Sequence, residues 1–282
     1  MGGANEVRTV RLPSGEAVAA LGQGTWRMGE EAGRRAEEIA ALRRGIELGL
    51  TLVDTAEMYG EGATETLVGE ALAGIRDQTF LVSKAYPQNA GRTALPKACE
   101  RSLARLRTDR IDLYLLHWRG SVPLAETVKA MERLREAGKI RHWGVSNLDL
   151  DDMEELVEAG GSACATNQIL YNAGRRGPEH DLLPWMSAQG IPAMAYSPVE
   201  QGRLAKAKAL AGIARRHDTS PAAVALAWVL RRPDVIAIPK AGTRAHVEEN
   251  GRALDLALTD DDLTEIDRAY PAPRRKVALE ML

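Results

Sequence analysis

The amino-acid sequence predicts an α/β barrel of eight strand–helix units, and two observations lead to this prediction. Short, mostly apolar runs rich in β-forming residues recur along the 282-residue chain, and a segment with helical periodicity follows each of them. Such runs are typical of parallel strands that are buried on both faces. Four polar residues that end successive runs are also spaced by roughly 30 residues, the length of one strand–helix unit. We therefore expect residues 1–282 to form a single (β/α)8 domain.

The expected elements follow one another without a linker or a low-complexity stretch. Strands are expected at 21–25, 51–54, 79–83, 111–116, 140–145, 163–168, 191–196 and 235–238. Helical periodicity is found at 34–48, 64–72, 94–106, 124–136, 150–158 and 182–189, and two helices at 206–216 and 221–231 lengthen the seventh unit. A β-hairpin around a Pro-Ser-Gly-Glu turn is expected at 9–18, and two final helices at 244–254 and 259–269.

Alternating strands and helices can also form an open, doubly wound sheet that binds a dinucleotide. Such a sheet should carry a G-x-G-x-x-G motif after its first strand. Here Gly22 and Gly24 provide the first two glycines, but Arg27 stands at the third position. The number of units and the missing third glycine favour the barrel over the open sheet.

Composition and charge narrow the class of protein. Hydrophobic residues make up 45% of the chain and charged residues 27%, which is ordinary for a globular fold, and the net charge of −2 gives no reason to expect binding to nucleic acid or to a membrane surface. The first ten residues lack the pattern of a signal peptide, and the longest apolar run, 222–230, is too short for a membrane helix. Because Cys99 and Cys164 form no CxxC pair, we expect no zinc site and no disulfide. We therefore expect a cytoplasmic monomer.

Polar side chains follow seven of the expected strands at the point where each strand ends. In a barrel of this kind, chemistry takes place at the C-terminal ends of the strands, where the following loops meet. The residues at these ends are Asp54, Lys84, His117, Ser146, Asn147, Gln168, Tyr196, Ser197 and Lys240. One polar residue beside a loop carries little information, but an Asp, a Lys and a His at three successive strand ends predict an active site.

Asp54, Lys84 and His117, together with Tyr59 in the loop after the second strand, are suited to donating a proton to a developing alkoxide. A phenol with a pKa of about 10 is a weak acid, and a neighbouring ammonium such as that of Lys84 lowers this pKa by favouring the phenolate. The Asp54 carboxylate can keep a buried lysine charged. His117 can donate a hydrogen bond to a carbonyl oxygen, so no metal is required.

Each of these residues also has a purely structural explanation. Asp54 and Lys84 could form an ion pair that only stabilises the fold, and His117 could be a strand-end histidine with satisfied hydrogen bonds. Tyr59 could be an aromatic residue that packs in a loop. The catalytic interpretation is favoured because all of these explanations would have to hold together.

The residues around these positions resemble the signatures of the aldo-keto reductase family. The segment 54–60, Asp-Thr-Ala-Glu-Met-Tyr-Gly, with Glu65 and Gly69 after it, resembles the first signature. Seven further segments resemble the later signatures of the family. They are 82–84 (Val-Ser-Lys), 115–118 (Leu-Leu-His-Trp), 144–147 (Gly-Val-Ser-Asn), 167–168 (Asn-Gln), 196–198 (Tyr-Ser-Pro), 238–240 (Ile-Pro-Lys) and 249–250 (Glu-Asn). Within the family the chain is most similar to compact bacterial reductases that act on methylglyoxal and other small carbonyls, through the stretches GQGTWRMGE, DLLPW and AYPAP.

The resemblance implies an NADPH-dependent reductase of small aldehydes, ketones and dicarbonyls, with the hairpin at the base of the barrel. It implies that Tyr59 is the proton donor, that Lys84 and Asp54 tune its pKa, and that His117 orients the carbonyl. The nicotinamide carboxamide would contact Ser146, Asn147 and Gln168, and the nicotinamide ring would stack on Tyr196. The expected cofactor site also includes Gly24, Thr25, Trp26, Asp54, Ser197, Glu249 and Asn250.

The loop after the eighth strand is the expected phosphate site. Lys240 and Arg244 could clamp a 2′-phosphate, with backbone N–H groups at the start of the following helix adding to its binding. Many NADPH-using relatives have Ser at the place of Ala241 and Arg at the place of His246. We expect NADPH as the cofactor, with NADH as the alternative.

Four aromatic residues, Trp26, Tyr59, Tyr86 and Trp118, stand in the loops after the first four expected strands, and with His117 they are expected to line the substrate pocket. Because few residues follow the last expected helix, we expect a shallow and permissive pocket. Two other classes of protein stay open as alternatives, a nucleotide-binding regulatory module and a barrel isomerase that uses His117 with a carboxylate. Turnover of a carbonyl compound with a nicotinamide cofactor would separate the reductase from both.

Overall fold

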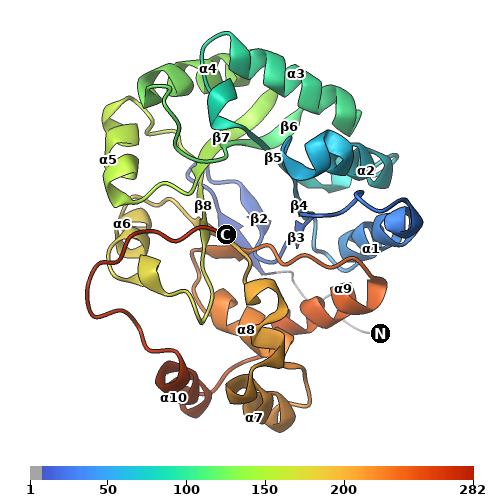
Figure 1. Ribbon diagram of the computed structural model, residues 1–282, viewed down its shortest axis with the longest axis vertical. Coiled ribbons are helices and arrows are strands. Elements are labelled where there is room, and N and C mark those ends of the chain that lie inside the picture. The colour runs from blue at the N-terminus through green and yellow to red at the C-terminus, as the bar shows by residue number, and fades with distance from the viewer. Residues whose placement is uncertain (1–7) are drawn as a thin grey trace.

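The computed structural model describes residues 8–282, which form a barrel of eight parallel strands surrounded by helices (Figure 1). The strands are β3 (Gln23–Gly24), β4 (Leu52–Asp54), β5 (Phe80–Ala85), β6 (Ile111–Leu116), β7 (Ile140–Ser146), β8 (Asn167–Leu170), β9 (Ala193–Tyr196) and β10 (Val235–Ala237), hydrogen-bonded in this order. Ahead of them, β1 (Thr9–Arg11) and β2 (Ala17–Ala19) pair as an antiparallel hairpin. Backbone hydrogen bonds of 2.8 Å from Gly22 N to Ala237 O and from Ala237 N to Ala20 O join the first strand to the last. The predicted (β/α)8 barrel is confirmed.

Ten α-helices of the described chain surround the barrel. They are α1 (Arg35–Glu47), α2 (Ala63–Ala71), α3 (Ala94–Leu106), α4 (Leu124–Glu136), α5 (Leu150–Glu158), α6 (Leu182–Ala188), α7 (Lys208–Arg216), α8 (Pro221–Leu230), α9 (Arg244–Gly251) and α10 (Asp260–Ala269). The first six each follow one strand, α7 and α8 both precede β10, and α9 and α10 follow it, as the sequence predicts. Asp149 begins α5 with a capping box, and the Ser220 side chain accepts a hydrogen bond from the Ala223 N–H at the start of α8.

The core lies on both sides of the sheet. Every residue of β4, β5 and β6 is buried, because the side chains of a barrel strand point alternately into the barrel and against the helix layer. Helix α8 is buried along nearly its whole length, in keeping with its apolar sequence. Of the helices within residues 8–282, none is long and apolar enough to cross a membrane. Residues 1–7, on which the expectation about a signal peptide partly depends, lie outside the described residues.

The sixth barrel strand lies later in the chain than predicted. We expected a strand at 163–168, but β8 begins at Asn167. The preceding residues form a turn in which the Cys164 N–H donates to the main-chain oxygen of Gly161 (3.0 Å), and the small side chains there carry little preference for a strand. Gln168 therefore lies inside β8, opposite Ser146 of β7, rather than at the end of the strand.

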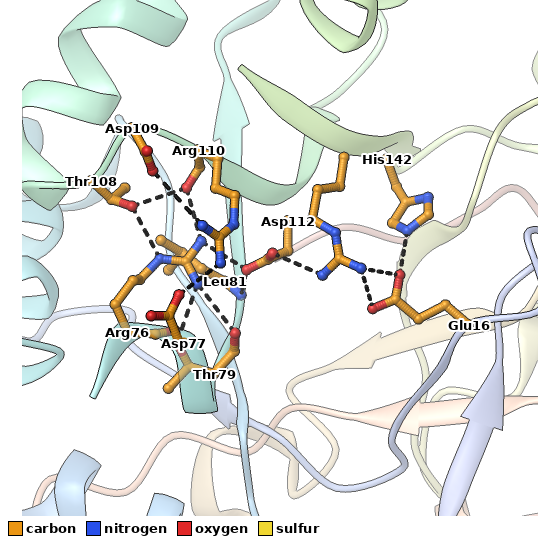
Figure 2. A network of polar contacts seen from close by, with 11 residues as sticks. Glu16, Arg76, Asp77, Thr79, Leu81, Thr108, Asp109, Arg110, Asp112 and His142 are labelled. Carbon is orange, nitrogen blue, oxygen red and sulfur yellow. Dashed lines mark hydrogen bonds and ion pairs between the residues drawn. The ribbon is translucent and has the colours of Figure 1, made fainter. Parts of the chain in front are cut away.

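A polar network closes the N-terminal end of the barrel (Figure 2). The buried carboxylate of Asp112 accepts the backbone N–H of Leu81 (2.8 Å) and pairs with Arg76 (2.8 Å) and Arg141 (3.2 Å). Arg141 also pairs with Glu16, in the turn of the N-terminal hairpin (2.8 Å). These contacts tie the hairpin to the N-terminal ends of the central strands and leave the opposite end of the barrel to the candidate site.

Candidate active site

Lys84 lies at the centre of a polar cluster at the C-terminal end of the barrel. Its fully buried Nζ donates hydrogen bonds to Oδ2 of Asp54 (2.8 Å), to the main-chain oxygen of Thr55 (2.8 Å) and to the hydroxyl of Tyr59 (3.1 Å). Asp54 is the last residue of β4, and Tyr59 begins a short turn in which Gly60 adopts a positive φ of 54°. This turn brings the Tyr59 hydroxyl back over the end of the neighbouring strand.

His117 stands beside the ring of Tyr59. The two ring centroids are 5.9 Å apart at an interplanar angle of 76°. Burial and the nearby Lys84 charge lower the pKa of His117 to about 2, so its imidazole is neutral at physiological pH. Its Nδ1 is buried without a hydrogen-bond partner in the described part of the chain, while the ring borders the main pocket. A neutral imidazole in this position can donate one hydrogen bond into the pocket.

The protonation states of this cluster depend on one another. Burial disfavours the Lys84 ammonium, but the Asp54 carboxylate and Tyr59 raise the Lys84 pKa above its ordinary value. Burial raises the pKa of Tyr59 above its ordinary value, and Lys84 opposes this shift while Asp54 adds to it. We expected Lys84 to lower the Tyr59 pKa, and it does act in that direction, but desolvation outweighs it. Tyr59 therefore carries its proton at neutral pH, as a proton donor must.

The cluster borders a pocket of about 830 Å³, within the usual size of small-molecule and cofactor sites. The expected residues that line it are Gly24, Thr25, Trp26, Asp54, Tyr59, His117, Trp118, Ser146, Asn147, Gln168, Tyr196, Ser197 and Lys240. Five other expected residues, Lys84, Tyr86, Arg244, Glu249 and Asn250, are not part of this lining, although Lys84 reaches it through its hydrogen bonds to Asp54 and Tyr59. Tyr86 instead packs edge-on against Trp118, which lines the pocket, with ring centroids 5.9 Å apart.

Amide and hydroxyl groups form one wall of the pocket. The Tyr196 hydroxyl donates to Oδ1 of Asn147 (3.0 Å), Nε2 of Gln168 donates to Oδ1 of Asp54 (2.8 Å), and Oγ of Ser146 donates to the Gln168 main-chain oxygen (2.8 Å). Asn147 has a positive φ of 58°, a conformation that Asn tolerates better than most residues. Converging amide groups beside a partly buried tyrosine ring fit a flat heterocycle that carries a carboxamide, such as nicotinamide.

Cationic side chains gather in another part of the pocket region. Arg34 and Lys240 both lie against the backbone at Gly242. A Cβ atom placed on this glycine would be 2.9 Å from Nη2 of Arg34 and 3.1 Å from Nζ of Lys240, so the two cations flank the same backbone segment. Burial and the Arg34 charge both lower the pKa of Lys240. Arg27 also lines the pocket, with its guanidinium 4.4 Å from the centre of the Trp26 ring. Converging cations next to the start of α9 fit a phosphate group.

Several residues in or beside the pocket escaped sequence reasoning. Arg27 and Arg34 follow the first strand, and no local pattern indicates that they lie near Lys240. Met281 and Leu282 also line the pocket, although we expected the C-terminal segment to leave it open. After α10, residues 271–282 run back across the mouth of the barrel and end near its centre (Figure 1). The pocket therefore has a wall on a side where the sequence predicted none.

The strand ends of this (β/α)8 barrel hold a buried Lys–Asp pair, a protonated tyrosine and a neutral histidine beside a large pocket. Such an arrangement is suited to an enzyme that transfers a proton to a bound small molecule. Residues 20–271 match the family model described as "Aldo/keto reductase family". The chain belongs to the aldo/keto reductase family, whose members reduce carbonyl groups with a nicotinamide cofactor. The family resemblance seen in the sequence is confirmed, and the protein is an oxidoreductase.

Similar proteins cover nearly the whole chain. Methylglyoxal reductase YeaE of Escherichia coli is 54% identical over 281 residues, which are 98% of this chain and 99% of that protein. Glyoxal reductase of Bacillus subtilis is 33% identical over 260 residues, 92% of this chain and 91% of that protein. An aldo/keto reductase structure from Klebsiella pneumoniae in complex with NADP and acetate has a TM-score of 0.95 and 52% identity, covering 98% of this chain and 99% of its own. A second structure from that organism, in complex with NADPH, has the same TM-score and identity.

Proposed function

We propose that this enzyme reduces small aldehydes, ketones and dicarbonyls such as methylglyoxal to alcohols, with NADPH as its cofactor. The observation that carries the proposal is the position of the buried Lys84 Nζ, 3.1 Å from the Tyr59 hydroxyl and 2.8 Å from Asp54. The names of the relatives, which are reductases of methylglyoxal and glyoxal, support a small substrate with adjacent carbonyl groups.

We assign the proton transfer to Tyr59. NADPH, when bound, supplies the hydride that adds to the carbonyl carbon. The carbonyl oxygen then gains negative charge, and the Tyr59 hydroxyl, which borders the same pocket, donates the proton to it. The Lys84 ammonium stabilises the phenolate that is left, and Asp54 keeps Lys84 charged in its buried position.

We assign the positioning of the carbonyl group to His117. A neutral imidazole keeps its single N–H throughout the reaction, so it orients the carbonyl oxygen without competing with Tyr59 as an acid. Because the buried Nδ1 has no partner among the described residues, we propose that the hydrogen is on Nε2 and points into the pocket.

The cofactor site that we propose spans the pocket. Ser146, Asn147 and Gln168 would hold the nicotinamide carboxamide, with Tyr196 against the ring. Lys240 would bind the 2′-phosphate. Gly24, Thr25, Trp26 and Ser197 would line the path between the two ends, Arg27 and Arg34 would add positive charge, and Arg244, Glu249 and Asn250 stay proposed contacts outside the pocket lining.

We also propose that the enzyme is a cytoplasmic monomer built from one domain. Cys99 and Cys164 are both free and buried, and burial raises the pKa of each thiol to about 12, which suits a chain that keeps its cysteines reduced. Light scattering after size-exclusion chromatography measures the oligomeric state, and a mass near twice that of the chain would contradict the monomer.

The test of the proposed function is NADPH oxidation with methylglyoxal by the wild type and by the Tyr59→Phe variant. We expect turnover by the wild type and a loss of about 10³-fold or more in kcat for the variant, which lacks the donated proton. NADPH binding, measured by fluorescence, should be unchanged because no proposed cofactor contact uses the hydroxyl. If the Phe variant keeps wild-type kcat, Tyr59 is not the acid. If the wild type binds NADPH but reduces no carbonyl compound, the reductase proposal fails.

A further inference from the structure

Arg175 connects two segments that border the substrate pocket. It lies in the turn after β8, where its backbone N–H donates to the main-chain oxygen of Asn172 (3.0 Å). Its guanidinium contacts Oε1 of Glu200 in the loop after β9 (3.0 Å) and Oε1 of Glu280 in the C-terminal segment (2.5 Å). One side chain therefore holds both the loop on one side of the pocket and the chain that crosses its mouth.

The Glu200 end of this connection is firmly held. Glu200 is buried, and its Oε2 accepts a hydrogen bond from Nδ2 of Asn172 (2.7 Å), while Arg203 approaches Oε1 to 3.3 Å. The loop around it bends sharply, with positive φ angles of 48° at Ser197 and 50° at Glu200. Non-glycine residues adopt this conformation only when their surroundings enforce it, so the buried carboxylate is part of what fixes the loop.

The Glu280 end is loosely held. Its side chain is 47% exposed, and an ion pair at such a position is weak and screened by salt. The segment is also attached by long polar contacts from Lys276 Nζ to Asp151 (3.3 Å) and to Asp181 (3.4 Å), and from the Leu279 N–H to Asp149 (3.4 Å). The partly buried Leu279 side chain packs against the core, and the Leu282 backbone contacts the Tyr196 hydroxyl. The two residues that follow Glu280 border the pocket, but their side chains are more than half exposed. The ion pair of Glu280 is therefore the charged contact that lies next to these two residues in the chain.

We propose that the Arg175–Glu280 ion pair is a releasable latch, which holds Met281 and Leu282 over the pocket and so limits the size of the aldehyde that enters. Arg175 is then a positioning residue, and Met281 and Leu282 are specificity-determining residues. The proposal rests on the proposed function because it takes this pocket as the carbonyl site. Because Glu200 is buried and Glu280 is exposed, the ion pair with Glu280 breaks first. Its loss frees the C-terminal segment, while the loop around Glu200 stays in place.

The test compares Glu280→Gln with the wild type on two aldehydes, methylglyoxal and 2-naphthaldehyde. The substitution removes the charge and keeps the size of the side chain. We expect kcat/KM for 2-naphthaldehyde to rise by about threefold or more, in line with loss of one exposed ion pair, while kcat/KM for methylglyoxal and the Kd for NADPH stay within about twofold. High salt should produce the same change in the wild type and a smaller change in the variant, where only the Lys276 ion pairs of the segment are left to be screened.

Three further variants separate the latch from a merely structural ion pair. Deletion of Met281 and Leu282 should give the same preference for the large aldehyde as Glu280→Gln. Arg175→Gln should in addition weaken NADPH binding. It also withdraws the guanidinium from Glu200, which helps to fix the loop that contains the proposed cofactor contact Ser197. The matched control is Glu100→Gln, which breaks an exposed pair with Lys139 (3.2 Å) near the N-terminal end of β7 and should leave the ratio of the two aldehydes unchanged.

Amide hydrogen exchange tests the latch without turnover. Residues 276–282 should exchange faster in Glu280→Gln than in the wild type, and the Glu200 loop should not. Unchanged exchange in 276–282, or an equal change in kcat/KM for both aldehydes, would overturn the proposal. If the wild type reduces neither aldehyde, but residues 276–282 still exchange faster in Glu280→Gln than in the wild type, the proposed function is refuted and the latch stays supported.

Discussion

The Nζ of Lys84 lies 2.8 Å from Oδ2 of Asp54, and both side chains are almost completely buried. Placing two charges in a low-dielectric interior is costly, so each charge is tolerated there because the other compensates for it. The remaining hydrogen bonds of the pair go to Tyr59, Thr55 and Gln168, all within the candidate site. We therefore expect that breaking this ion pair will affect both the stability of the barrel and the proposed chemistry of the pocket.

Lys84→Met should lower both the stability of the protein and its activity. The substitution leaves the Asp54 carboxylate buried without its cation, and the expected loss in free energy of unfolding is about 3–5 kcal/mol. It also removes the charge that opposes the rise in the Tyr59 pKa, so the phenol becomes a still weaker acid and kcat should fall by about 10²-fold or more. Urea unfolding and steady-state kinetics with methylglyoxal measure the two effects.

The double variant Asp54→Asn with Lys84→Met separates the effect on stability from the effect on activity. It removes both charges, so stability should return to within about 1–2 kcal/mol of the wild type. Activity should not return, because Tyr59 still lacks its ammonium. Recovery of kcat in the double variant would show that the pair serves the fold alone.

The pH dependence of kcat/KM for reduction follows from the pKa shifts in the site. The proposed reaction needs protonated Tyr59, whose pKa is raised by burial above its ordinary value, and neutral His117, whose pKa is lowered to about 2. Neither group changes protonation between about pH 5 and pH 9, so the profile should be flat there and fall only on the alkaline side. A step near the ordinary histidine pKa that disappears in His117→Gln would contradict this prediction.

The same histidine should make the protein sensitive to acid. In the unfolded chain His117 binds a proton below about pH 6.5, whereas in the fold its pKa is about 2, so the unfolded state gains stability as the pH falls through this range. At about pH 5 the cost relative to neutral pH is about 2 kcal/mol. His117→Gln should remove this part of the acid destabilisation, measured as the difference in free energy of unfolding between the two pH values. An identical difference in wild type and variant would place His117 in contact with solvent.

The predicted catalytic residues were accessible from sequence because they stand at the ends of strands. Asp54 ends one apolar run and His117 directly follows another, and parallel strands of one barrel bring their C-terminal ends together whatever the loops do. The strand that contains Gln168 was misplaced because small residues before it gave no contrast between turn and strand. Local patterns therefore predict an element well only where its apolar run is bounded by clear signals.

The rest of the site depends on contacts between distant parts of the chain. Arg175 and Glu280 are 105 residues apart, and neither stands in a periodic pattern that could indicate the other. Arg34 and Lys240 lie near each other only because the barrel closes between its first and last strands. Such pairs follow from the closed fold, and they become visible only when the loops at the strand ends are placed in space.

The position of Arg34 and Lys240 leads to a prediction about cofactor choice. Lys240→Ala should raise the KM for NADPH by about tenfold or more, the effect of losing a charge-assisted hydrogen bond, and leave the KM for NADH nearly unchanged. Arg34→Ala should act in the same direction, because both cations flank Gly242 beside the start of α9. Lys129→Ala, on the exposed face of α4, is the matched control for loss of one positive charge and should change neither value. If Lys240→Ala weakens NADPH and NADH equally, the lysine binds a group that both cofactors share, and the 2′-phosphate must be recognised elsewhere.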